Sequence, residues 1–122
     1  MAGEIDRDPE FLAFIELFNR GEYAASAERL VPLWQATQDP FYKGLIQLAG
    51  AMSHWEDGSF FWAADLLASG HNLLQPYAPV HDGIDVDDLL ERVRHAHALA
   101  EAARRAPAGE QPPLPSIPLR PA

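Results

Sequence analysis

The stretch from Phe18 to Leu67 limits the possible folds of this chain more than any other feature, because it is dense in apolar residues and its breaks are very short. Its apolar residues recur at three- and four-residue intervals, the spacing of amphipathic helices. The breaks at 19–21, 39–40 and 57–59 contain a glycine or an aspartate–proline pair, which end and restart helices. Helices joined by so few residues run antiparallel to their neighbours. The sequence therefore predicts tight antiparallel helix hairpins.

Further signals mark where individual helices begin. The pairs Asp8-Pro9 and Asp39-Pro40 each supply a carboxylate that can cap a first turn and a proline whose missing N–H is not needed there. A last helix is expected from Asp85, because acidic residues lie early in it and arginines late. The second predicted helix is the one whose apolar residues recur at helical spacing from Tyr23 to Trp34. Pro32 lies inside it, where we expect a kink or an early end. Residues 1–106 are thus predicted to form an all-α, compact bundle of about five helices.

The third predicted helix, from about Phe41 to Glu56, combines a broad apolar surface with one unusual polar stripe. Gln47, Gly50 and His54 lie on this stripe, nearly opposite the apolar face. Because a helix that is apolar around most of its circumference lies centrally in a bundle, we expect the stripe to face another helix, with Gly50 allowing close approach. The predicted apolar face consists of Phe41, Leu45, Leu48, Met52 and Trp55.

The fourth predicted helix, from about Phe60 to Leu74, has a very wide apolar arc. Phe61 falls on its polar side and is not easily buried in its own bundle, so we expect it to cover the tail or a second subunit. A loop is expected from Gln75 to Ile84. The predicted arc contains Trp62, Ala63, Leu66, Leu67, Gly70, Leu73 and Leu74.

Residues 107–122, the tail, hold six of the chain's eleven prolines and are not expected to be helical. Prolines recur at every third position, as do Leu114, Ile117 and Arg120, so a polyproline helix would carry a proline ridge and an apolar ridge ending in arginine. Residues 115–120 also match the PxxPxR pattern that aromatic grooves bind. The alternative is a disordered linker. A solvated linker gains nothing from apolar residues such as Leu119. We therefore expect the tail to pack on its own domain or on a neighbouring copy.

Composition narrows the function classes. A net charge of −9 repels phosphate backbones and anionic lipid headgroups, so we expect neither nucleic acid nor membrane as partner. The absence of cysteine excludes disulfides and thiolate-ligated metals. The sequence has no basic segment followed by an apolar run and no apolar stretch of about 18 residues, so we expect a cytoplasmic location. No phosphate loop, dinucleotide fingerprint or Ser-His-Asp arrangement is recognisable, and no cofactor is expected.

Between about Phe11 and Leu74 the chain carries an ordered set of spaced residues, which is far more specific than a single motif. The set comprises Phe18-Asn19-x-Gly21-x-Tyr23, Glu28, Leu33-Trp34, Phe41-x-x-Gly44-Leu45-Ile46-Gln47-Leu48-Ala49, His54, Gly58, Ala63 and Leu66-Leu67. In this pattern the chain resembles the DUF309 family, small all-helical bacterial and archaeal proteins of unassigned function. The family's usual Tyr-Trp-Glu-Ala-His-Glu is here Tyr23-Ala24-Ala25-Ser26-Ala27-Glu28, so only Glu28 of its three polar residues remains. Val31 stands where the family has a further Glu.

The resemblance implies a polar cluster between the second and third helices, of which this chain retains Glu28, Gln47 and His54. Two strong ligands and an amide make a weak metal site, because catalytic zinc usually has three protein ligands, so no metal is expected. A Glu28–His54 interaction across the two helices would satisfy both groups and fix the helix register. His71 lies on a stripe of apolar residues and is expected to be half-buried and hydrogen-bonded.

Two functional hypotheses remain. The first is a non-enzymatic helical interaction module that associates with itself, as a homodimer, or with another protein, with Phe61, Leu114 and Ile117 at the interface. The second is a small ligand- or metal-binding protein, or a hydrolase-like enzyme, with a pocket around Glu28, Gln47 and His54. A solvent-connected cavity at that cluster favours the second hypothesis, whereas a direct hydrogen bond in a dry interface favours a structural network.

Overall fold

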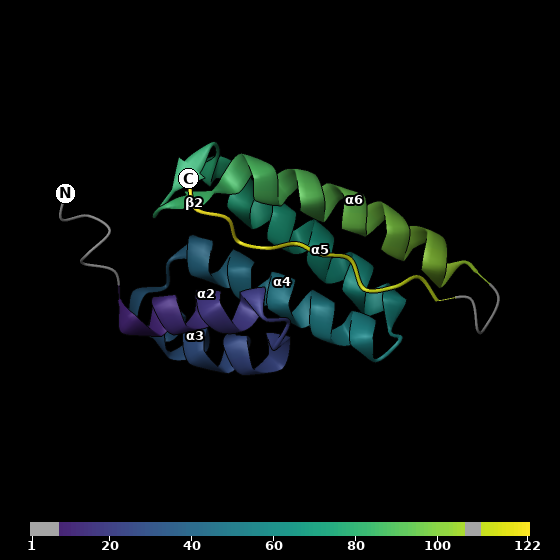
Figure 1. Ribbon diagram of the computed structural model, residues 1–122, viewed down its shortest axis with the longest axis horizontal. Coiled ribbons are helices and arrows are strands. Elements are labelled where there is room, and N and C mark those ends of the chain that lie inside the picture. The colour runs from purple at the N-terminus through teal and green to yellow at the C-terminus, as the bar shows by residue number, and fades with distance from the viewer. Residues whose placement is uncertain (1–7, 107–110) are drawn as a thin grey trace.

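Five α-helices make up most of the chain in a computed structural model, which describes residues 8–106 and 111–122. Helix α3 packs against α2 and α4, and α5 packs against α4 and α6, so neighbours in the sequence are neighbours in space (Figure 1). The prediction of a mostly helical chain is confirmed. The helices are α2 (Pro9–Asn19), α3 (Tyr23–Thr37), α4 (Pro40–Glu56), α5 (Phe60–Leu74) and α6 (Val86–Arg104).

The segment between α5 and α6, predicted to be a loop, contains a short 3-10 helix, η1 (Gln75–Tyr77), and a small hairpin. Strands β1 (Val80–His81) and β2 (Ile84–Asp85) pair antiparallel. The turn is Asp82-Gly83, and both residues have positive φ, 52° and 78°. A two-residue hairpin turn requires this conformation, which an aspartate–glycine pair adopts readily. The chain is therefore helical with a two-stranded sheet, and the all-α prediction was too simple.

The helix starts follow the predicted capping residues. The Asp8 carboxylate accepts a hydrogen bond from Glu10 N at 2.7 Å, and that of Asp39 accepts one from Phe41 N at 3.0 Å. Asp85 caps α6 in the same way, by accepting from Asp88 N at 2.9 Å. These contacts satisfy backbone donors that have no partner inside the helix.

The predicted early end of the second helix at Pro32 is wrong, because α3 continues to Thr37. Proline removes only one backbone hydrogen bond, to the carbonyl of Glu28. Both Pro32 and Glu28 are exposed, so water can reach that carbonyl. The packing of the helix against its neighbours offsets the lost bond.

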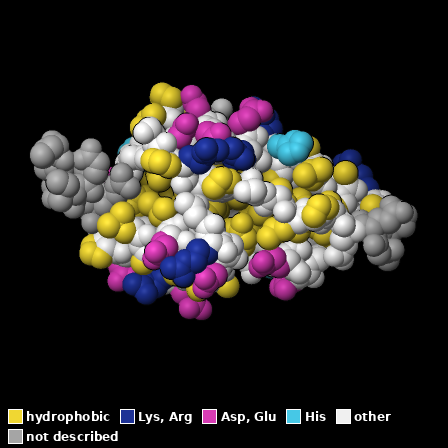
Figure 2. Space-filling view, viewed as in Figure 1, with side chains coloured by type: hydrophobic (Ala, Val, Ile, Leu, Met, Phe, Trp, Pro, Cys, Tyr) yellow, Lys and Arg dark blue, Asp and Glu magenta, His cyan; other side chains and the backbone are white. Residues whose placement is uncertain are grey.

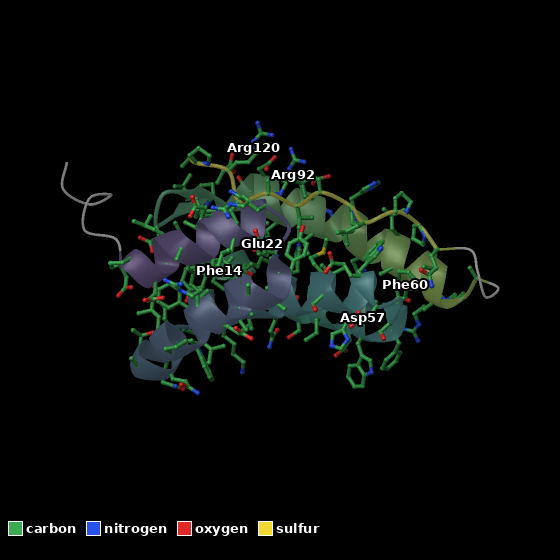
Figure 3. All side chains as sticks on the ribbon, turned by 60° about the horizontal axis from the view of Figure 1, so that its bottom comes forward. Phe14, Glu22, Asp57, Phe60, Arg92 and Arg120 are labelled. Atoms are coloured by element: carbon green, nitrogen blue, oxygen red, sulfur yellow. The ribbon has the colours of Figure 1, made fainter. Side chains whose placement is uncertain are left out.

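The core is centred on α4, whose predicted apolar face is buried along its whole length, from Phe41 to Trp55. Phe14 of α2 lies towards one end of this core and Phe60 of α5 towards the other (Figure 3). None of the helices in the described part of the chain is both long and apolar enough to cross a membrane.

Helices α4 and α5 approach closely through two glycines. A Cβ atom at Gly70 would lie 2.7 Å from Leu48 Cδ2 and 3.1 Å from the carbonyl oxygen of Gly44, and one at Gly44 would lie 2.8 Å from Leu74 Cγ. At Gly50, a Cβ would meet only Leu66 Cδ1, at an ordinary 3.5 Å. The sequence predicted that a glycine lets this helix lie close to another one. The close approach of α4 and α5 depends on Gly44 and Gly70, however, and not on Gly50.

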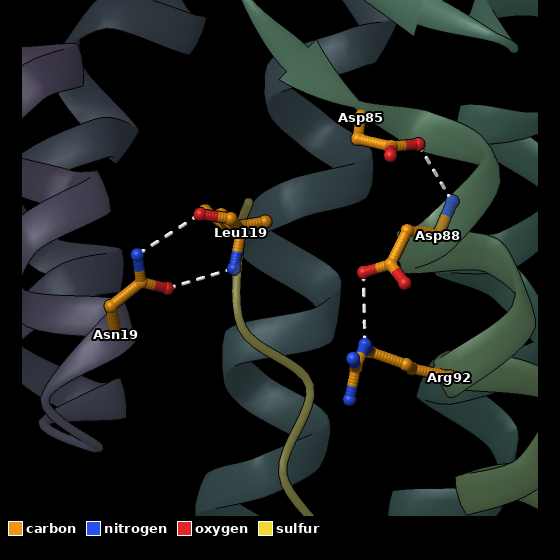
Figure 4. Close-up of polar contacts among 5 residues, drawn as sticks. All are labelled: Asn19, Asp85, Asp88, Arg92 and Leu119. Carbon is orange, nitrogen blue, oxygen red and sulfur yellow. Dashed lines mark hydrogen bonds and ion pairs between the residues drawn. The ribbon is translucent and has the colours of Figure 1, made fainter. Parts of the chain in front are cut away.

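The described part of the tail, residues 111–122, returns from the far end of α6 to the β-hairpin (Figure 1). It forms no helix and crosses the face of the bundle between α2 and α6 (Figure 4). Hydrophobic side chains gather along the middle of this face, whereas acidic and basic ones lie mainly along its upper and lower margins (Figure 2).

Candidate functional site

The bundle holds the tail by its main chain. Five hydrogen bonds join residues 112–122 to the rest of the described chain, and every one uses a main-chain atom of the tail. Their partners are Asn19, Trp55, Gly83 and Asp85, which we call the cradle. The cradle residues come from α2, α4 and the β-hairpin. The sequence divides the chain into a bundle and a tail, and the cradle is the place where the two meet.

Asn19, the last residue of α2, contributes two of these bonds (Figure 4). Its side-chain Nδ2 donates to the Leu119 carbonyl oxygen at 3.1 Å, and Leu119 N donates to its Oδ1 at 2.8 Å. A side-chain amide has one acceptor and one donor group, which matches the C=O and N–H of a single extended residue. The contact therefore recognises backbone and not side-chain identity.

Two apolar side chains anchor the same part of the tail. Ile117 is 1% exposed and Leu119 is 2% exposed, and both belong to the main hydrophobic core. Leu114 remains 38% exposed, and Arg120 is exposed too. The buried residues are thus two positions apart, as on one face of an extended strand. The predicted three-residue ridge of Leu114, Ile117 and Arg120 does not form a single buried face.

The last tail residues extend the β-hairpin. Asp85 N donates to the Arg120 carbonyl oxygen at 2.9 Å, and Ala122 N donates to the Gly83 carbonyl oxygen at 2.9 Å. An antiparallel bridge links Ile84 to Pro121. The Arg120 side chain points away from the bundle (Figure 3). This is the geometry of strand addition, in which main-chain bonds hold a segment and buried side chains select it.

At the other end of the tail, Trp55 Nε1 donates to the Pro112 carbonyl oxygen at 3.3 Å. The ring of Trp55 is 3% exposed and lies edge-on to Phe60, with ring centroids 5.4 Å apart. A buried indole N–H needs an acceptor, and the Pro112 carbonyl oxygen supplies it.

The predicted polar cluster is not assembled as expected. Gln47 Oε1 accepts a hydrogen bond from Ser69 Oγ on α5, and the His54 ring centroid lies 6.5 Å from that of Trp62, also on α5. Glu28 is exposed on α3, and no hydrogen bond or ion pair of the described residues joins it to Gln47 or His54. The polar stripe therefore faces the following helix, α5, instead of the preceding one.

Helix geometry explains the position of Glu28. Ser26 and Leu30 are buried, and two residues correspond to about 200° around a helix, so Glu28 points away from the face that both share. Across residues 8–106 and 111–122, no three His, Asp or Glu side chains are arranged to hold a metal ion.

Two aromatic side chains at the start of α5 are exposed. Phe61 is 51% exposed, as its position on the polar side suggested, and the Arg104 guanidinium lies 5.0 Å from its ring centroid. Trp62, predicted to lie in the apolar arc, is 53% exposed. Phe60 faces the core, and a residue two positions further on lies about 200° away, so Trp62 cannot face it too.

Sequence reasoning missed the cradle. Asn19 appeared in the resemblance pattern, but nothing local distinguishes an asparagine that bonds to residue 119 from one that ends a helix. The usable signals were the apolar residues Ile117 and Leu119, which needed a cover, and the Asp-Gly pair that predicts a hairpin.

Comparison with known proteins gives one match. No curated protein and no solved structure matches the chain. The sequence model of the family DUF309, described as a domain of unknown function, matches residues 11–66. This range covers most of α2, all of α3 and α4 and about the first half of α5, and so includes Asn19 and Trp55 of the cradle but none of the tail. The match supports the assignment of residues 11–66 to the DUF309 family.

Proposed function

We propose that the chain is a protein-association module whose cradle binds an extended, proline-containing segment, and that its own tail occupies this site. The observation that carries the proposal is the double hydrogen bond between the Asn19 side chain and the Leu119 backbone. A site that reads backbone accepts any segment of suitable shape, including one from another protein or from a second copy of the chain.

The apolar contacts define which segments suit the cradle. Ile117 and Leu119 are both buried, with Pro118 half-buried between them. A partner segment would therefore carry two branched apolar residues separated by one residue, with a free carbonyl some residues earlier for Trp55. Proline lowers the entropy that such a segment loses on binding, because its backbone is already restricted.

The tail is the natural competitor of any partner. A tethered segment has an effective concentration of about millimolar, so a partner must bind well or the tail must be weakened. The test uses the full chain carrying Ile117→Ala and Leu119→Ala together, to weaken the tail, and a fluorescent peptide with the wild-type sequence of residues 111–122. Fluorescence anisotropy measures binding.

We expect saturable binding to the weakened-tail chain, at least about tenfold tighter than to the wild-type chain, which corresponds to about 1.4 kcal/mol. A peptide with alanine at both anchor positions is the matched control and should bind much more weakly. Adding Asn19→Ala to the weakened-tail chain should also reduce binding. Equal binding of both peptides, or no binding, would contradict the proposal.

A second association surface is proposed at Phe61 and Trp62, whose exposure favours contact with a second copy of the chain. Sedimentation velocity compares the wild type with a Phe61→Ala, Trp62→Ala double variant, with Leu12→Ala as control, because Leu12 is also 46% exposed but lies on α2. A dimer that only the double variant loses supports this surface. A dimer that persists, or a wild-type monomer at all concentrations, rejects it.

A further inference from the structure

Two features of the described chain still lack an explanation, the buried His71 imidazole and the three-residue proline repeat of the tail. Contrary to the prediction that His71 is hydrogen-bonded, its buried Nε2 atom has no partner among the described residues. The nearby Arg94 is paired with Glu91, so this part of the fold selects no ligand. The proline repeat, in contrast, matches the hydrogen bonds of the cradle.

The last four residues of the tail are bound along both edges of their backbone. Leu119 turns its N–H and C=O groups to Asn19 of α2 (Figure 4). The Arg120 carbonyl oxygen and the Ala122 N–H turn instead to the β-hairpin. Neighbouring residues of an extended strand present their polar main-chain groups to opposite sides, so bonds to two sides fix the register of the segment.

Two N–H groups of the tail take part in these bonds. Within residues 111–122, those of Leu119 and Ala122 donate to the bundle, whereas the other three bonds use tail carbonyl oxygens. A proline at either donor position would remove a bond, because proline has no N–H. A proline at position 121 removes none, since ladder bonds lie on both sides of the Ile84–Pro121 bridge and the nitrogen of Pro121 faces away from the hairpin.

Pro118 and Pro121 come directly before the two donor positions. The residue before a proline is held in an extended conformation. These residues are Ile117, whose side chain is buried, and Arg120, whose carbonyl oxygen accepts from Asp85 N. The proline repeat therefore has the same three-residue spacing as the donors and lies one position before them.

We propose that the cradle selects its partner segments by the phase of their prolines, that is, by the position of each proline relative to the two donors. The partner is an extended segment of another protein with the pattern apolar–Pro–apolar–x–Pro–x, in which neither the second apolar residue nor the last residue is proline. The first x is unrestricted, because the Arg120 side chain points away from the bundle (Figure 3). This inference rests on the proposed function, since it names the partner class of the same site.

Peptides of identical composition test the phase, with the weakened-tail chain and fluorescence anisotropy as above. In the first peptide Pro121 and Ala122 are exchanged, which removes the donor to Gly83. In the control Pro115 and Ser116 are exchanged, because Ser116 is exposed and its N–H donates to no described residue. We expect the first peptide to bind at least about fivefold more weakly than the wild-type peptide, and the control to bind within about twofold of it.

A backbone ester tests the other donor, because it replaces one N–H group by oxygen and keeps the side chain. The ester is placed at Leu119, and a matched ester at Ser116 is the control, since both residues follow a proline. The ester at Leu119 should weaken binding about tenfold, because it removes a donor and leaves Asn19 Oδ1 facing an oxygen atom. The ester at Ser116 should have no such effect.

The outcomes separate this inference from the proposed function. If the wild-type peptide binds and each altered peptide binds as well as its control, the phase is overturned and the proposed function stands. If the wild-type peptide does not bind, both are overturned.

Discussion

Asn19 and Leu119 are one hundred positions apart in the sequence, yet the side chain of the first pairs with both main-chain polar groups of the second, at 3.1 and 2.8 Å. This contact ties the end of α2 to the tail and lies beside two fully buried tail side chains. The tail is therefore part of the fold of the bundle. It closes the face between α2 and α6 that five helices alone would leave open (Figure 4).

Asn19→Ala should destabilise the docked tail by about 1–3 kcal/mol, because it removes two hydrogen bonds worth about 0.5–1.5 kcal/mol each. Hydrogen exchange of the Leu119 amide should accelerate more than that of core amides in α4, since the tail can detach while the bundle stays folded. Glu16→Ala on the exposed side of the same helix is the control. Unchanged exchange at Leu119 in Asn19→Ala would contradict the role given to this residue.

The two tail positions Ile117 and Leu114 form a matched pair. Ile117→Ala should cost about 2–5 kcal/mol of docking free energy, because it empties a buried site. Leu114→Ala should change stability by no more than about 0.5 kcal/mol, because the side chain is 38% exposed. Urea denaturation and limited proteolysis after residue 106 measure both effects. Equal effects of the two substitutions would show that the tail is docked differently.

How much of the fold could be predicted from the sequence depends on whether the contact that determines each feature joins residues close together in the chain. The helix starts at Pro9, Pro40 and Val86 follow from caps within three residues of each start, and these were predicted. The burial period of the tail was not predicted: its proline repeat suggested three, whereas the buried residues Ile117 and Leu119 lie two positions apart, just before the bridge to Ile84 of β2. That partner lies more than thirty residues earlier in the chain.

The same distinction applies to the candidate site. The polar stripe of Gln47 and His54 was correctly placed on one side of α4, since helix periodicity is local. The helix that this stripe faces was not predicted correctly, because periodicity does not say whether α3 or α5 lies on that side of α4. Glu28 was included through the family resemblance, although its neighbours Ser26 and Leu30 define the buried face of α3.

The glycines of α4 and α5 give a third prediction. Gly70→Ala should destabilise the chain by about 1–3 kcal/mol, because the added methyl group would lie 2.7 Å from Leu48 and 3.1 Å from the Gly44 backbone. Gly50→Ala should be neutral or stabilising by up to about 1 kcal/mol, since its contact is ordinary and alanine favours helix. Thermal melting of the two variants compares them directly. A stable Gly70→Ala variant would mean that α4 and α5 are less closely packed than described.

The last prediction concerns pH and His71. Burial, with the nearby charges of Arg94 and His97, lowers the pKa of His71 in the folded chain below its ordinary value of 6.5. Between these two pKa values the unfolded chain binds more protons than the folded one, so protonation favours unfolding. The contribution of His71 to stability is therefore complete above about pH 6.5 and is lost as the pH falls towards its folded pKa.

Urea denaturation of the wild type and of His71→Gln, from about pH 7.5 to about pH 5.5, isolates this contribution, because carboxylates titrate alike in both. The wild type should lose more free energy of unfolding over this range than the variant does. Parallel curves would show that His71 titrates alike in the folded and unfolded states, and that its imidazole is reached by water instead of being enclosed between α5 and α6.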